Sequence, residues 1–349
     1  MIRSVTPDQI KHWLQRTAIT IFAATAIVSI ALVWLWRDRT SLDDIDWPPY
    51  PYIEPSLDAV TMTWLGVTTL LFDDGETQIL IDGFFSRPTL FDALLSRQVS
   101  SNAVTINYVL DEYRMRRLAA IIPVQSHYDH AMDIGAIANR SSASILGSAS
   151  TANIARGAGV PEDQIIVAEN RGTYSFGQFT LTMIEAPHAP IGWGGSVPVA
   201  GTIDEPLQTP ASIWAYREGQ SYSVVLTHPH GTTLVHGSGG YAEGALQGIQ
   251  ADIVLLGMAM LDGLGRDYVE QYWQAVVTNT GAAHVLPMHF DDLTQPFGEV
   301  LLYPRALDDF VKTSEWLEEI AATWDADTRL HLPEFGKAIV LYPEASPEA

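Results

Sequence analysis

Two histidines and one aspartate lie within four residues of one another in the first half of the chain. His127, Asp129 and His130 belong to the stretch Gln-Ser-His-Tyr-Asp-His-Ala-Met-Asp, residues 125–133. Imidazole nitrogens and carboxylate oxygens are donors that Zn²⁺ and several other divalent metals bind in proteins. Their close spacing therefore predicts a metal site.

The element that must position these side chains is an apolar run, residues 118–124, which predicts a buried β-strand. The three side chains would then lie on the loop that leaves the end of this strand. Paired strands are also predicted upstream, at residues 61–66, 68–72 and 77–81, with a turn before the third. A rigid sheet is thus expected to hold the candidate site.

Strand and helix patterns alternate through the rest of the chain and indicate an α/β (α+β) protein. Further strands are predicted at residues 144–147, 179–184, 222–227, 232–236, 253–256, 284–287 and 338–342. Helices are predicted at residues 131–139, 151–157, 268–279 and 308–323. A segment rich in Gly and Pro, residues 192–210, is expected to form a long loop over the site.

Several of these segments resemble the metallo-β-lactamase superfamily. Its signature is His-x-His-x-Asp-His, and residues 125–130 match this pattern with Gln125 in place of the first His. A Trp-Leu-Gly-x-x-Thr segment, residues 64–69, and an Ile-Leu-x-Asp strand, residues 79–82, also resemble the superfamily. The resemblance covers residues 60–343 and implies a four-layer αββα sandwich, here preceded by one transmembrane helix.

The resemblance also implies two neighbouring metal positions. Each would be surrounded by three side chains: Gln125, His127 and His188 at the first, and Asp129, His130 and His289 at the second. His188 follows a predicted strand and a Pro turn, and His289 lies in a Pro-x-His-Phe element that resembles the superfamily's last ligand loop.

The turn after the strand at residues 232–236 bears on the number of metals. It reads His-Gly-Ser-Gly, and Ser238 stands where many superfamily members carry an Asp that bridges two ions. A neutral hydroxyl is a poorer bridge than a carboxylate, so Ser238 is predicted to hydrogen-bond around the ligands instead. His236 is predicted to have a similar secondary role.

The donor set that the resemblance implies fits zinc, as one or two ions, and would also accept iron or manganese. The implied activity is hydrolysis of a small-molecule ester, lactone, amide or phosphodiester by a metal-activated hydroxide. Asp129 would be the catalytic residue, because it would bind one metal and orient the nucleophile. Fold resemblance does not identify the substrate.

Two alternatives remain open at this point. The chain could be a β-lactamase, because one subclass of those enzymes also has Ser at the bridging position and some of its members tolerate Gln at the first. The same departures, Gln125 and Ser238, also motivate a catalytically degenerate, metal-binding scaffold of the cell envelope.

Composition excludes several other classes. The 349 residues are 47% hydrophobic and 17% charged, which provides material for a sizeable core. The formal net charge of −22 disfavours nucleic acid as a partner, because phosphate backbones attract clustered Lys and Arg. The absence of cysteine excludes disulfides, thiolate metal sites and a Cys nucleophile, and it suits an oxidising periplasm.

An uncharged, apolar stretch near the N-terminus, residues 17–36, predicts a transmembrane signal anchor. At about 1.5 Å per helical residue it spans roughly 30 Å, the thickness of a hydrocarbon core. The basic residues around it slightly favour a cytoplasmic N-terminus and a catalytic domain in the periplasm. The alternative is a signal peptide cleaved at residues 24–26, but cleavage there would leave a strongly apolar new N-terminus.

These features divide the chain into five segments. They are a cytoplasmic N-terminus (residues 1–16), the membrane anchor (17–36), a linker (37–58), a metallo-β-lactamase-like domain (59–343) and a tail (344–349). The linker is rich in Asp and Pro and has no helical or strand periodicity, so it is predicted to be a semi-rigid spacer. The expected partners are the inner membrane, through the anchor, and a small-molecule substrate.

Overall fold

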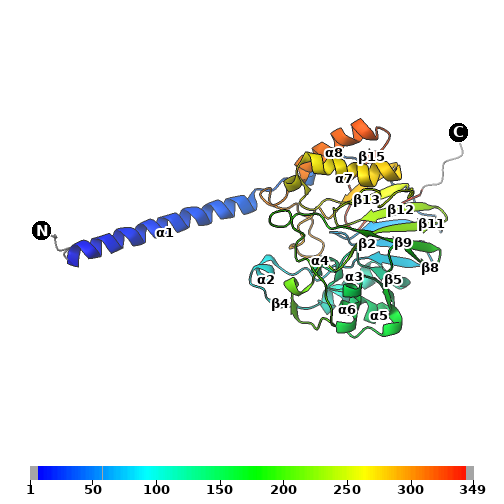
Figure 1. Cartoon of the computed structure of the whole chain (residues 1–349), viewed down its shortest axis with the longest axis horizontal. Helices are drawn as coiled ribbons and strands as arrows, with labels where there is room; N and C mark the ends of the chain where they lie inside the picture. Colours follow the sequence, from blue (N-terminus) through cyan, green and yellow to red (C-terminus); the bar gives the residue numbers. More distant parts are fainter. Residues whose placement is uncertain (1–6, 57, 343–349) are drawn as a thin grey trace.

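The computed structural model describes residues 7–56 and 58–342. The remaining positions lie outside the described residues, and they include the predicted tail at residues 344–349. Figure 1 shows one long helix that projects from a body of stacked sheets and helices.

The first sheet has seven strands. In spatial order they are β16 (Ala338–Val340), β1 (Thr61–Trp64), β2 (Leu70–Asp73), β3 (Gln78–Ile81), β5 (Leu118–Ile122), β6 (Ser144–Gly147) and β7 (Ile165–Val167). Antiparallel pairing joins β16 to β1, β1 to β2 and β2 to β3, whereas β3, β5, β6 and β7 are parallel.

The second sheet also has seven strands. In spatial order they are β15 (Arg329–Leu330), β14 (His284–Met288), β13 (Ile253–Gly257), β12 (Gly231–His236), β11 (Ser221–His228), β9 (Phe179–Ala186) and β8 (Gly172–Phe176). Here β12 to β15 are parallel, and β8, β9, β11 and β12 pair antiparallel. A separate short ladder joins β4 (Gln98–Val99) to β10 (Ala211–Ser212).

Alternation along the strands explains why the two sheets stack. In β2, Leu70 and Phe72 face the core between the sheets, whereas Leu71 faces the opposite side and packs in a second core. In β3, Ile79 and Leu80 divide between the two cores in the same way. Because successive side chains of a strand point to opposite faces, a strand that is apolar at every position must be covered on both sides.

Helices supply that cover. The outer face of the first sheet packs against α3 (Ala103–Glu112), α5 (Ile134–Ser141) and α6 (Ala149–Gly157), and the second sheet against α7 (Arg266–Trp273) and α8 (Phe310–Trp324). Beyond α7 the chain continues as a π-helical turn, Gln274–Thr278. The predicted four-layer αββα sandwich is therefore confirmed.

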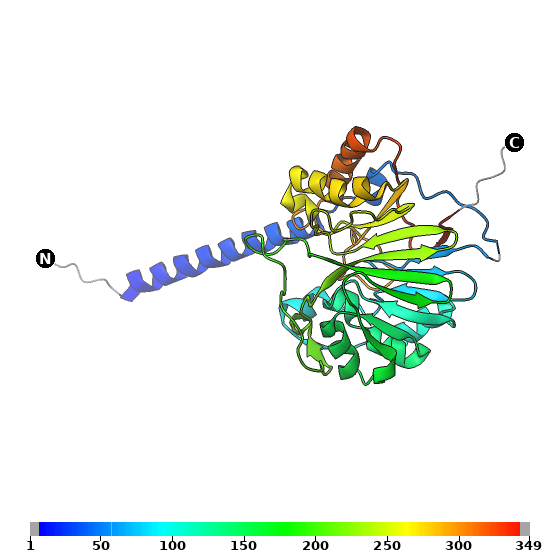
Figure 2. The ribbon, with the colours of Figure 1, turned by 45° about the vertical axis from the view of Figure 1, so that its right-hand side comes forward.

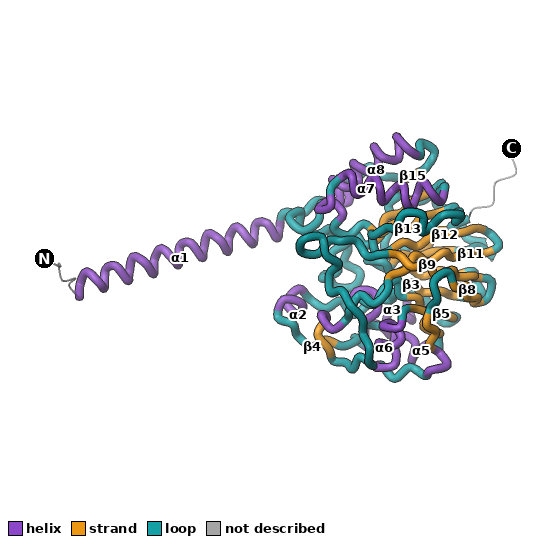
Figure 3. The backbone as a smooth tube through the Cα atoms, viewed as in Figure 1, coloured by secondary structure: helices purple, strands orange, loops and turns teal. Residues whose placement is uncertain are grey.

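One edge of the sandwich collects the loops that carry the candidate residues. The strands β3, β5, β9, β12 and β14 all end at this edge, because their ladders make them parallel within their own sheets. Figure 3 shows that loops gather at the end of the body nearest α1. Carboxyl ends of strands that meet at one edge bring distant parts of the sequence together.

The projecting helix is α1 (Pro7–Arg37). Its segment Lys11–Arg37 is long and apolar enough to cross a membrane, and none of its apolar window is buried within the molecule. Figures 1 and 2 show that this helix extends away from the body along most of its length. The predicted anchor at residues 17–36 lies inside it.

The segment that follows α1 is not simply the semi-rigid spacer that its composition predicts. Ile45, Trp47 and Tyr50 are buried in the core of the body. The Trp47 indole donates to Glu318 Oε1 at 2.6 Å, and the Tyr50 hydroxyl donates to the carbonyl of Leu341 at 2.8 Å. The first part of the linker is therefore docked on the domain, and this expectation is corrected.

The docked linker leads to a prediction about stability. Replacing Trp47 with Ala should lower the free energy of unfolding by about 3 kcal/mol, because it leaves a cavity where the indole packs on Phe310. The matched variant Trp193→Ala should change it little, since the Trp193 side chain is 99% exposed. Chemical denaturation of both variants checks this. Equal, small effects would contradict the docking of the linker.

Candidate metal centre

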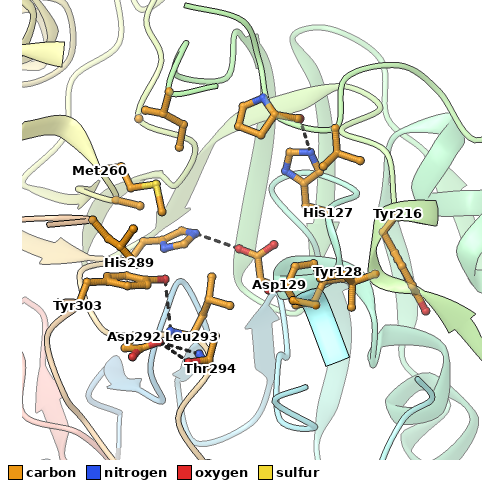
Figure 4. A pocket seen from close by; sticks show the side chains of 18 of the residues that line it. His127, Tyr128, Asp129, Tyr216, Met260, His289, Asp292, Leu293, Thr294 and Tyr303 are labelled. Carbon is orange, nitrogen blue, oxygen red and sulfur yellow. Dashed lines mark hydrogen bonds and ion pairs between the residues drawn. The ribbon is translucent and has the colours of Figure 1, made fainter. Parts of the chain in front are cut away.

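Three of the predicted ligands converge at the loop edge. Donor atoms of Asp129, His130 and His289 all lie within 4.8 Å of one another, and all three residues are buried. Asp129 Oδ2 lies 3.2 Å from His130 Nε2 and 3.1 Å from His289 Nε2. Figure 4 shows Asp129 and His289 pointing toward each other from opposite walls of a pocket.

Local structure explains the orientation of the first two. The chain leaving β5 runs through residues 123–127 and then enters the short helix α4 (Tyr128–Ala131), with His127 at its N-cap, so Asp129 and His130 lie on a helical turn rather than on the predicted loop. Neighbouring residues on one helical turn point in different directions, so Asp129 turns toward the pocket while His130 enters the interior.

Asp82 orients His130, although it was not among the predicted site residues. Asp82, at the end of β3, lies 2.7 Å from His130 Nδ1, and the Thr68 hydroxyl lies 2.9 Å from the same nitrogen. Asp82 also accepts a hydrogen bond from the backbone N–H of Val124 at 2.9 Å. A proton held on Nδ1 directs Nε2 toward Asp129, as in the carboxylate–histidine–metal arrangement of many metalloproteins. The Ile-Leu-x-Asp strand was the signal that could have identified Asp82.

Interlocked loops hold His289. Its backbone N–H donates to the Val67 carbonyl at 2.8 Å, and the Val67 N–H in turn donates to Asp291 Oδ1 at 2.7 Å. His289 and Val67 both adopt left-handed backbone conformations, with φ of 60° and 51°. Such conformations persist for residues other than glycine where the surroundings over-determine them, and they cluster at functional sites. Arg87, 3.6 Å from Asp291, adds a buried ion pair to this support.

The residues present fit a divalent cation. His130 Nε2 is buried and makes no hydrogen bond with the described residues, and His289 Nε2 contacts Asp129 Oδ2 at 3.1 Å. Burial opposes charge on Asp129, but His130 and His289 outweigh it and hold the pKa of Asp129 well below its usual range. Burial likewise opposes charge on His130, yet Asp129 and Asp82 raise its pKa to about 10. Two buried carboxylates thus demand a positive charge, which a metal could supply in place of a proton.

His127 and His188 form a second pair of imidazoles in the same pocket. Their ring centroids are 5.2 Å apart. His127 Nε2 lies 3.0 Å from the Pro198 carbonyl and His188 Nδ1 lies 2.7 Å from the Ala189 carbonyl, so each ring uses one N–H and keeps one free lone pair. Burial lowers the pKa of both, that of His188 to about 4. Both rings are therefore neutral near pH 7, as metal ligands require.

Gln125 is engaged by neighbouring side chains. Its Oε1 accepts a hydrogen bond from the Ser238 hydroxyl at 3.1 Å and lies 3.0 Å from the Ser221 hydroxyl, whose single proton is shared with Glu218 Oε1 at 3.0 Å. An amide oxygen has two lone pairs, and in this arrangement the two serine hydroxyls face them. The geometry makes Gln125 and Ser238 partners of each other.

His236 lies behind the turn rather than on the pocket wall. Its Nδ1 is 2.7 Å from the Ser223 hydroxyl and its Nε2 is 2.7 Å from the Gly240 carbonyl. A Cβ at Gly240 would come within 2.3 Å of the Pro187 carbonyl oxygen, so only glycine permits this close approach. His236 thus stabilises the turn after β12, which packs against the segment that carries His188.

This buried imidazole predicts a pH dependence. Burial lowers the pKa of His236 from 6.5 to about 4. The unfolded chain therefore binds more protons between these values, so stability is present above pH 6.5 and is lost as the pH falls toward 4. The contribution is about 3 kcal/mol over this interval. In urea unfolding of the metal-free protein, the free energy of unfolding should depend less steeply on pH in His236→Gln than in the wild type. Equal pH dependence in the two proteins would contradict a lowered pKa of His236.

The pocket that the ligands share has a volume of about 350 Å³. Asp129, His127, His188 and His289 line it together with many apolar side chains. Part of its wall comes from the segment between β9 and β10, through Ile191, Pro198 and Val199. This is the long loop predicted over the site.

Comparisons with known proteins point the same way as the sequence motifs. No protein-family model matches the chain. A curated relative, a UPF0173 metal-dependent hydrolase of Rhizobium etli, is 27% identical over 128 residues, which are 37% of this chain and 47% of the relative. The chain thus matches about half the length of that relative. The predicted resemblance is confirmed as similarity to a metal-dependent hydrolase.

Solved structures with a similar arrangement are distant in sequence. The metallo hydrolase Igni18 of Ignicoccus hospitalis is 15% identical, with a TM-score of 0.49 over 80% of this chain and 97% of that one. The metallo-β-lactamase fold protein YhfI of Bacillus subtilis is 13% identical, with a TM-score of 0.46 over 80% of this chain and 98% of that one. The order of the strands in the two sheets of this chain is itself that of an αββα sandwich.

Proposed function

We infer that the protein is a membrane-anchored, metal-dependent hydrolase whose reaction takes place beside Asp129, His130 and His289. The observation that supports this most strongly is the convergence of three buried donors, among them the unpartnered Nε2 of His130, beside a pocket that Asp129 and His289 line. Structural metal sites are usually closed by four protein ligands, whereas a three-ligand site leaves room for water and substrate.

Each residue has a distinct part in the proposed reaction. A bound metal would supply a Lewis acid that activates a water molecule and polarises the scissile bond. Asp129 uses Oδ2 toward the two histidines, and the described residues make no hydrogen bond to its Oδ1, which can orient the attacking water. Asp82 is a positioning residue, because it acts through His130.

We place a single ion at this position. Zinc suits its nitrogen and carboxylate donors best, and iron or manganese would also bind them. His127 and His188 supply two donors for a second ion, but Gln125 Oε1 accepts from the Ser238 hydroxyl and also faces the Ser221 hydroxyl. In the proposed reaction the two neutral imidazoles therefore hold polar groups of the substrate.

A panel of model substrates tests the activity. The full-length protein should hydrolyse at least one ester, lactone, amide or phosphodiester, lose the activity in a chelator and regain it with zinc. Turnover of nitrocefin in preference to the others would identify a β-lactamase. The absence of metal-dependent turnover throughout would favour the scaffold and overturn the hydrolase.

The membrane topology has its own test. The helix Lys11–Arg37 supports an anchor, and the basic residues near it favour a body on the periplasmic side. A protease added to intact spheroplasts should degrade the body. Full protection of the body, with digestion after lysis, would reverse the proposed orientation.

A further inference from the structure

The end of the apolar helix contributes to the wall of the candidate active site. Trp36, in the last turn of α1, lines the same pocket as Asp129 and His289. A tryptophan at the end of a membrane span lies at the level of the lipid headgroups. If α1 spans a membrane, the pocket therefore lies at the membrane surface.

Specific contacts hold the pocket in that place. Arg39 pairs with the buried carboxylate of Asp292 at 2.8 Å and donates to the Leu302 carbonyl. The backbone N–H of Arg305 donates to the Asp38 carbonyl at 2.8 Å. The Arg39 guanidinium lies over the Trp36 ring, 5.5 Å from its centroid. Asp292 follows His289 by three residues. The membrane helix is thus tied directly to the loop that carries a metal ligand.

The elements around α1 expose apolar side chains. On α2 (Leu90–Leu94), Leu94 is 67% exposed, and Figure 1 shows α2 on the side of the body from which α1 projects. Trp193 is 99% exposed, and Figure 2 shows its loop, between β9 and β10, reaching toward the end of α1. Exposed apolar patches on a soluble surface are costly and mark contacts with a partner or a membrane.

The pocket wall continues this apolar surface inward. Leu90, Ala93, Trp214 and Leu307 line the pocket, and Trp214 and Leu307 are also about half exposed. The Trp214 indole donates to the Ala93 carbonyl at 3.0 Å, which joins α2 to the segment that follows β10. An apolar path therefore runs from the exposed surface beside α1 to the metal ligands.

We propose that the substrate of this site is a lipid of the bilayer that holds α1, whose acyl chain enters through this apolar wall while its scissile linkage meets Asp129. The proposal rests on the proposed hydrolase function and names its substrate class. A lipid is favoured over a protein partner because the exposed apolar residues and the pocket lie at the end of a membrane span.

Photo-crosslinking in a membrane tests this inference without requiring turnover. The full-length protein is placed in vesicles of phosphatidylethanolamine and phosphatidylglycerol that contain a phosphatidylethanolamine with a diazirine in its acyl chain. After irradiation in the presence of a chelator, peptides containing Leu90–Leu94 or Trp214 should carry label in addition to α1. Label confined to α1 would overturn the proposal.

Two comparisons sharpen the test. Trp214→Gln should lower pocket labelling about fivefold, because it makes the wall polar. The matched variant Trp324→Gln should not, since Trp324 is similarly exposed and also donates its indole N–H, but lies on α8. With the wild-type protein, oleoyl lysophosphatidylcholine should compete for labelling and a hexanoyl analogue should not. Equal competition by both would contradict entry of an acyl chain.

The outcomes separate the two proposals. Pocket labelling by the lipid without turnover of any substrate would support the lipid site and overturn the hydrolase. Metal-dependent turnover of a water-soluble substrate, with no lipid label in the pocket, would support the hydrolase and overturn the lipid.

Discussion

Asp129→Asn should lower kcat/KM by at least about a thousandfold, measured on whichever substrate the wild-type protein hydrolyses. The change keeps the shape of the side chain but removes the negative charge that faces His130 and His289 at 3.2 and 3.1 Å. The metal position then loses its only anionic ligand. The oxygen proposed to orient the attacking water also becomes a weaker acceptor. Both kcat and the affinity for the metal should therefore decrease.

The control for this substitution is Asp163→Asn. Asp163 is exposed in the short helix Glu162–Gln164, so the same chemical change there should leave turnover unchanged. Circular dichroism of both variants shows whether they are folded. If a folded Asp129→Asn protein keeps wild-type turnover at saturating zinc, Asp129 is not the catalytic residue.

Asp82→Ala should have the largest effect on stability. It removes a buried carboxylate that holds His130 at 2.7 Å and the Val124 N–H at 2.9 Å, which would leave the Val124 N–H without a partner and His130 Nδ1 with the Thr68 hydroxyl alone. Removing one member of a buried, charged pair costs about 3 to 5 kcal/mol. Metal affinity should fall about 10- to 100-fold, because the orientation of His130 is lost. Urea unfolding and zinc titration against a competing chelator measure the two effects.

Thr68→Val provides a graded comparison with Asp82→Ala. It removes only the hydroxyl that contacts His130 and Asp82, so a cost of about 1 kcal/mol is expected. If Asp82→Ala lowered the free energy of unfolding but left zinc affinity at the wild-type value, Asp82 would support the fold alone and would not position His130.

The fold could be predicted where a pattern of neighbouring residues determines the element. Residues 118–124 are apolar throughout, and the first five of them, Leu118–Ile122, form β5, which lies between β3 and β6. The linker was not predictable in this way. Trp47 and Tyr50 lie in a Pro-rich segment without periodicity, and they are buried by Phe310 and Leu341, which lie at the other end of the chain. Burial that depends on such distant partners leaves no local pattern.

In the candidate site, too, some features follow from local sequence and others depend on distant residues. The close spacing of His127, Asp129 and His130 predicts a metal site by itself, whereas His289 follows another strand and required the resemblance. Spacing also could not show that Gln125 Oε1 faces two serine hydroxyls, because one of its partners, Ser221, lies on β11 of the other sheet. Hydrogen-bond partners across two sheets are a property of the packed fold.

The metal content of the full-length protein tests the proposed centre most directly. After reconstitution with zinc, mass spectrometry should find one ion per chain in the wild-type protein and in His284→Ala, whose histidine lies at the far end of β14. His289→Ala should lose the ion. Retention of the ion in a folded His289→Ala protein, or no ion in the wild type even after reconstitution, would contradict a catalytic metal at Asp129, His130 and His289.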